Sequence, residues 1–178
     1  MLGLIMALGF GIVSCDSNPN TNNSSTTSTT TPTTTPEAAT TPSTVVDPLL
    51  DQAKKAKESE GKLYLGSMER AQQAYFLEKG KFATSVDELQ LGIKADTPNY
   101  TYKIESNDAN QVIMTATSKQ PELKSFTGVV VVEKPGTPEA MTMRISCATD
   151  SASSTPPAVT EKIASAAAFK CPSGSTQL

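Results

Sequence analysis

Thiols and carboxylates are the groups in this chain that could do chemistry, because its 178 residues include no histidine. Without histidine the chain lacks the usual general base near neutral pH and the commonest metal ligand. A serine–histidine–carboxylate triad is therefore excluded, as are most zinc hydrolase sites. Two carboxylate pairs remain, Asp87 with Glu88 and Glu58 with Glu60. The first pair belongs to an expected helix start, which acidic groups favour, and the second stands two apart on a helix and shares no face.

Cys15 has the most specific chemical surroundings of the three cysteines. It closes the run Ile12-Val13-Ser14-Cys15, at the end of an apolar stretch that begins at Leu2. This run resembles the signal of bacterial lipoproteins, which implies that the thiol receives a diacylglyceryl group and that residues 1–14 are a cleaved signal peptide. The stretch is too short to span a bilayer, which takes ~20 residues, and it fits the ~7–15-residue core of a secretory signal.

Two alternatives stay open for this segment. It is a buried strand with an incidental cysteine, or it is a pilin-type leader cut between Gly9 and Phe10, with Ser14 standing where such a pilin needs glutamate. Met1 is followed directly by an apolar residue instead of the basic residues that secretory signals carry. We therefore expect the true start to lie upstream.

If Cys15 is lipidated, Cys147 and Cys171 are the two cysteines that remain, and we expect them to lie in an oxidising compartment. A disulfide is the default expectation for such a pair, and a metal site without a nearby third ligand is the weaker alternative. The bridge would close a loop of about 24 residues and contribute about 3 kcal/mol by the chain-entropy estimate. It would hold the C-terminal residues against the sheet edge.

The residues that follow Cys15 are almost wholly Ser, Thr, Asn and Pro. Such a segment buries too little apolar surface to offset the entropy of ordering it. We expect residues 15–47 to be a lipid-anchored, disordered stalk, either a plain spacer or an O-glycosylated one. The net charge of −3, without any basic cluster, argues against binding to nucleic acid.

The ordered part begins at Asp47-Pro48, a favourable helix start. Apolar residues then recur at helical spacing and predict one long amphipathic helix over 48–78, stopped by Gly80. Gly61 and Gly66 weaken its middle by ~1 kcal/mol each relative to alanine. These glycines indicate places where the helix passes closely over another element.

A short turn and a series of strands follow the helix. Ser85 to Glu88 form a capping box that predicts a turn, pinned to the core by Phe82 and Leu89. Alternating apolar residues then predict antiparallel strands over 100–105, 112–117, 129–132 and 141–147. The third strand is apolar on both faces and is therefore expected to be central. In the fourth, Met141, Met143, Ile145 and Cys147 share the inward face, alternating with Thr142, Arg144 and Ser146.

These elements predict an α+β domain over residues 48–147. One long amphipathic helix packs on a four-stranded antiparallel sheet, giving two layers and a single core. Residues 148–178 return to Ser, Thr and Pro, and we expect a flexible tail with a short helix over 159–169 and a disulfide-closed loop.

This order of elements resembles the globular domain of type IV pilins. More specifically, Ala53 to Lys62 and Arg70 to Ala83 are similar to the type IV pilin-like G/H proteins of cyanobacteria, as are Leu89 to Lys94 and Tyr100 to Cys147. The resemblance covers about residues 48–175 and leaves out the N-terminus. There, pilins carry a highly apolar half-helix through which they polymerise, and this chain has the lipoprotein-type signal and the polar stalk instead.

The resemblance implies a non-enzymatic lipoprotein, anchored in a bacterial membrane, whose pilin-like domain faces the periplasm or cell surface. Its expected role is protein or surface interaction, related to pili, secretion or adhesion. The expected partners are the membrane, through Cys15, and pilus or secretion-system proteins. We expect no cofactor, no metal, no nucleic acid and no small-molecule substrate. The alternative is a minor pilin or pseudopilin of a type IV pilus or type II secretion filament.

Overall fold

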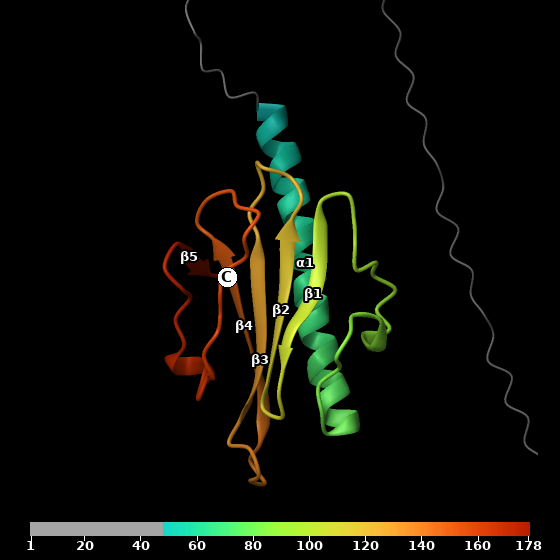
Figure 1. Ribbon diagram of the computed structural model, residues 1–178, viewed down its shortest axis with the longest axis vertical. Helices are drawn as coiled ribbons and strands as arrows, with labels where there is room; N and C mark the ends of the chain where they lie inside the picture. Colours follow the sequence, from blue (N-terminus) through green and yellow to red (C-terminus); the bar gives the residue numbers. More distant parts are fainter. Residues whose placement is uncertain (1–47) are drawn as a thin grey trace, which may run out of the picture. The chain divides into compact units, whose positions relative to one another are not determined.

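A computed structural model describes residues 48–178, except the side chains of residues 106 and 107. Helix α1 (Pro48–Lys79) ends one residue later than predicted. Gly80 stops it with a φ of 67°, a left-handed conformation that glycine adopts without strain, and its amide donates to the Phe76 carbonyl at 2.8 Å. Figure 1 shows α1 running alongside the strands of the sheet.

The sheet is antiparallel and follows the order of the chain, β1-β2-β3-β4-β5. Its strands are β1 (Tyr100–Asn107), β2 (Gln111–Ser118), β3 (Phe126–Glu133), β4 (Met141–Thr149) and β5 (Ser175–Gln177). The predicted helix on an antiparallel sheet is confirmed, and β3 is central, as its apolar sequence indicated. The fifth strand was not predicted. It pairs with only three residues of β4, from Cys147 to Thr149.

The main core lies between α1 and the sheet. It contains fully buried residues of the helix and of the first three strands, among them Leu65, Met68, Tyr100, Met114, Phe126 and Val130. Gly61 allows this close packing, because a Cβ there would lie 2.7 Å from the Tyr100 ring and 2.9 Å from the Phe126 ring. Gly66 has no such neighbour within 3.4 Å, so the expectation of a close approach holds for Gly61 alone.

The loop between α1 and β1 is fastened by Gln72, which is fully buried on the helix. Its side-chain amide donates to the Ala83 carbonyl at 3.1 Å and accepts from the Ala83 amide at 2.9 Å. The predicted turn follows as the 3-10 helix η1 (Asp87–Leu89), and Phe82 and Leu89 are buried as predicted.

The capping box differs from the predicted one in a single bond. The Ser85 hydroxyl accepts from the Glu88 amide at 3.3 Å, as a capping box requires. The Glu88 carboxylate, however, accepts from the amide and hydroxyl of Thr84, one residue earlier than expected.

The face of the sheet that points away from α1 carries a second, smaller core. Ile113, Val129 and Val131 are buried there beneath Val159, Ile163 and Ala166. The expectation of a single core is therefore wrong. The helix predicted over 159–169 is also wrong in extent, since only the 3-10 turn η2 (Ala166–Ala168) forms.

The orientation of strand β4 is opposite to the prediction. The row of side chains that was expected to face the core beneath α1 points to the other side of the sheet. The row of Met141, Met143, Ile145 and Cys147 lies on the side of the second core, because it stands in register with Val131, Val129 and Thr127 of β3. The polar row of Thr142, Arg144 and Ser146 faces α1 instead. The polar side chains of α1 described below account for this orientation.

Candidate functional site

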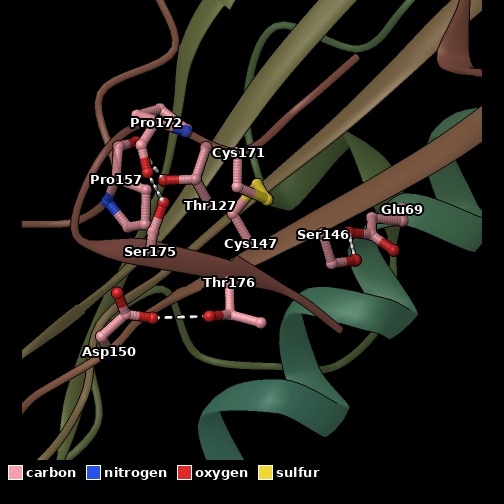
Figure 2. The surroundings of a disulfide bond; sticks show 10 residues. All are labelled: Glu69, Thr127, Ser146, Cys147, Asp150, Pro157, Cys171, Pro172, Ser175 and Thr176. Carbon is pink, nitrogen blue, oxygen red and sulfur yellow. Dashed lines mark hydrogen bonds between the residues drawn. A yellow bond between two sulfur atoms is a disulfide. The ribbon is translucent and has the colours of Figure 1, made fainter. Parts of the chain in front are cut away.

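The predicted disulfide is present between Cys147 and Cys171. The two residues lie 24 positions apart in the chain, with their Cα atoms 5.8 Å apart. Figure 2 shows Cys147 of β4 joined to the segment that leads into β5. The other predicted site residue, Cys15, lies outside the described residues, and its lipidation stays a prediction.

Hydrogen bonds around the disulfide hold the chain on both sides of it (Figure 2). Thr127 lies opposite Cys147 in the β3–β4 ladder, and its hydroxyl donates to the Pro157 carbonyl at 2.7 Å. The Thr176 hydroxyl of β5 donates to the Asp150 carboxylate at 2.6 Å. The disulfide therefore joins β4 to a segment that is already fixed before and after it.

Two polar side chains at the ends of neighbouring strands fasten the middle of this segment. The Gln111 side chain donates to the Glu161 carbonyl at 3.2 Å and accepts from the Ile163 amide at 2.8 Å. The Glu133 carboxylate accepts from the Ala166 amide at 2.8 Å. Residues 150–174 thus form a cover over the second face, held by apolar contacts, side-chain hydrogen bonds and the disulfide.

On the opposite side of the same strand lies a buried carboxylate, Glu69 of α1. The Ser146 hydroxyl donates to Glu69 Oε1 at 2.6 Å, and Arg144 Nη1 lies 3.6 Å from Oε2 (Figure 2 shows the serine contact). Glu69 lies directly over Gly128 of β3, where an added Cβ would stand 2.4 Å from Oε1. Only 1% of Glu69 is exposed, so a substrate has no access to the carboxylate.

Burial raises the pKa of Glu69 from its ordinary 4.5 to about 6, although Ser146 and Arg144 lower it. This carboxylate therefore changes its charge near pH 6. A raised pKa is often a sign of catalysis. Here the Ser146 hydroxyl and the Arg144 guanidinium contact the two carboxylate oxygens, so Glu69 links α1 to β4.

One turn further along the helix, Gln73 makes a second polar contact with β4. Its side chain donates to the Thr142 carbonyl at 2.9 Å and to the Thr142 hydroxyl at 3.1 Å. The structural roles of Glu69, Gln72 and Gln73 were not predicted from the sequence. A signal for the first two was present, because Glu69 and Gln72 each stand four residues after a buried apolar residue of the same helical stripe, Leu65 and Met68 respectively.

The carboxylates considered for acid–base chemistry bind loop residues instead. Glu58 accepts from the Lys124 amide at 3.3 Å, and Glu60 accepts from the Asn99 side chain at 2.7 Å. Glu88 accepts from the amide and hydroxyl of Thr84, just before η1. The structure does not bring either predicted pair together around a common cavity.

The four tyrosines of the chain all pack in the main core, and two of them are fully buried. Tyr100 and Tyr102 are buried, and Tyr64 and Tyr75 are partly buried against the same core. The Tyr100 hydroxyl donates to the Lys124 carbonyl at 3.0 Å. Burial raises the pKa of both inner phenols, so they remain protonated.

Between residues 48 and 178, no three His, Cys, Asp or Glu side chains are grouped so that they could hold a metal ion. In that same range, no helix combines the length and the apolar character needed to cross a bilayer.

Comparison with known proteins gives one match. The sequence profile of the family described as type IV pilin-like G and H matches residues 58–172. Neither the curated proteins nor the solved structures contain a match. The matched range extends from the first third of α1 to the residue after the disulfide, and it covers well over half of the chain. Together with the helix-on-sheet architecture and the disulfide-closed segment, it shows that the chain belongs to the type IV pilin-like G and H family.

Proposed function

We propose that this protein is a lipid-anchored, non-enzymatic display module. In this proposal Cys15 carries the lipid, residues 15–47 are the stalk, and the pilin-like domain binds a protein or a surface in a pilus-, secretion- or adhesion-related role. The domain faces the periplasm or the cell surface.

The character of α1 is the observation that carries the proposal. The helix buries one side, including Leu65, Met68 and Gln72, and exposes charged residues such as Lys55 and Arg70 on the other. A helix of this kind packs on its own sheet and does not supply an apolar surface all round. Before it, the sequence from Asp16 to Thr44 is polar apart from four prolines and two alanines. These features favour an anchored display domain over a subunit that polymerises through its helix.

The carboxylates of the domain accept hydrogen bonds from its own groups, which supports a binding role over catalysis. Glu58, Glu60, Glu69 and Glu88 each accept hydrogen bonds that hold a loop or a strand. A general acid or base must instead reach a proton of the substrate within about 3 Å. The exposed loops and strand edges of the domain are therefore the surfaces that we assign to partner binding.

Metabolic labelling with a palmitate analogue tests the anchor. We expect the full chain to incorporate the label and Cys15→Ala to lose it. Cys171→Ser is the matched control, because it removes a different cysteine and keeps the label. Incorporation that survives Cys15→Ala contradicts the anchor, and absence of any label favours the minor pilin or pseudopilin instead. Fractionation of labelled cells would then assign the anchor to the inner or outer membrane.

A deletion strain and a pull-down test the binding role. We expect the deletion to alter motility or adhesion, and the tagged protein to recover pilus or secretion components. Unchanged motility and adhesion, together with a pull-down that recovers none of these components, would refute this part of the proposal.

A further inference from the structure

Half of β4 forms an open edge of the sheet. Strand β5 pairs with Cys147 to Thr149, and the Leu178 amide donates to the Ser146 carbonyl at 3.0 Å. Within the part of the chain that the structure describes, no strand lies beside residues 141–145 on that side. An edge of this kind presents backbone donors and acceptors that can pair with another strand.

The alternation of the strand identifies the outward backbone groups. The Ser146 carbonyl points outward, because it accepts from the residue after β5. Arg144 and Thr142 stand two and four residues earlier, respectively, and therefore turn their amides and carbonyls the same way. The Thr142 carbonyl already accepts one hydrogen bond from Gln73, which leaves its second lone pair available.

The side chains beside this edge are unusually apolar for an exposed strand. Met141 is 53% exposed and Met143 is 40% exposed, and they are the large hydrophobic residues most exposed on any described strand. Both lie on the face of the second core, in line with the buried Ile145. The edge therefore combines unpaired backbone groups with an apolar strip, which favours association over solvation.

We propose that this edge pairs with the same edge of a second copy of the protein. In an antiparallel arrangement about a two-fold axis at Met143, Thr142 of each copy lies opposite Arg144 of the other. Each of these two pairs exchanges two backbone hydrogen bonds, so four bonds join the copies. Met143 then packs against its own equivalent.

Charge and side-chain fit favour a second copy over an unrelated peptide. Arg144 is the single charged residue in 141–145, and the register places it opposite a threonine and not opposite another arginine. Its guanidinium is also partly neutralised by Glu69 of its own copy. A symmetric contact needs one surface to fit itself, and this strand meets that requirement without opposing like charges.

Cysteine cross-linking tests the pairing and its register. In the full chain carrying Cys15→Ala, purified in detergent micelles, Met143→Cys is oxidised with copper–phenanthroline and analysed by non-reducing electrophoresis. The two Cα atoms at position 143 would lie about 4.5 Å apart, which is within the range of a disulfide. Met141→Cys is the matched control, because Met141 is the more exposed methionine of the same strand, and its two copies would lie about 14 Å apart.

We expect the Met143→Cys chain to form a covalent dimer many-fold faster than the Met141→Cys chain. Equal rates would show random collision, and no dimer from either variant would show no contact; both results overturn the pairing. Sedimentation velocity of the chain with its natural methionines gives an independent reading. Its apparent mass should rise with concentration, and Met143→Lys should abolish the rise. Because the background lacks Cys15, these results do not depend on the lipid anchor.

Discussion

Replacing Glu69 with glutamine should change how the stability of the domain depends on pH. The substitution keeps the shape of the side chain and removes its ability to ionise. In the natural protein the carboxylate lies buried over Gly128 and its pKa is raised to about 6. The folded protein therefore binds a proton at Glu69 more tightly than the unfolded chain does, between pH 4.5 and 6.

The sign and size of the effect follow from this pKa shift. Because the folded-state pKa is raised, the stability that Glu69 contributes is fully present below about pH 4.5 and is lost as pH rises through 6. A shift from 4.5 to about 6 corresponds to about 2 kcal/mol of unfolding free energy. The Glu69→Gln protein lacks this loss, so its stability relative to the natural protein should rise by about 2 kcal/mol between pH 4.5 and 7.5.

Urea unfolding followed by circular dichroism, at half-unit steps of pH, measures this difference. Glu78→Gln is the control, because Glu78 is exposed near the end of the same helix and its loss removes the same charge. We expect the control profile to stay parallel to that of the natural protein. If the difference between the Glu69→Gln and natural proteins stays constant across this range, the buried charge does not carry the cost that we assign to it.

Three further substitutions test the packing. Gly61→Ala should lower the free energy of unfolding by about 1–3 kcal/mol, because the added methyl group meets two buried rings. Gly66→Ala, in open surroundings, should raise it by up to about 1 kcal/mol. Chemical denaturation compares the two variants, and equal effects would contradict the close approach at Gly61. Gly128→Ala should displace the Glu69 carboxylate and cost about 1–3 kcal/mol, and an unchanged urea midpoint would contradict that overlap. Cys171→Ser should cost about 3 kcal/mol, with dithiothreitol giving the same loss in the natural protein and none in the variant.

The periodicity of the sequence was sufficient to predict α1 and the first four strands. Helical spacing after Pro48 and alternation after Asn99 are strong because each element packs one face on a large core. Alternation says which residues share a face, but not which face meets the helix. In β4 the polar face does so, because Glu69 and Gln73 supply hydrogen bonds to it.

The cover formed by residues 150–174 could not be predicted from sequence patterns, for a different reason. Val159, Ile163 and Ala166 contact the second core from an irregular backbone, so no helical or strand period relates them. Strand β5 has three polar residues, and it forms because the neighbouring disulfide and the Asp150 carboxylate bring it to β4. The disulfide itself was predictable, because Cys147 and Cys171 are the pair left once Cys15 is set aside.

The polar side-chain contacts of α1 also affect how the domain responds to mechanical force. Glu69 and Gln73 attach the helix to strand β4, and Gln72 attaches it to one loop. Figure 1 shows the helix running alongside the strands. A pull applied at Pro48 along the helix would act on these bonds together, in shear, instead of peeling them off one after another. An attachment loaded in this way resists force better than its modest equilibrium stability indicates. For a domain held by its N-terminal side in flowing liquid, that resistance would decide how long the domain stays folded.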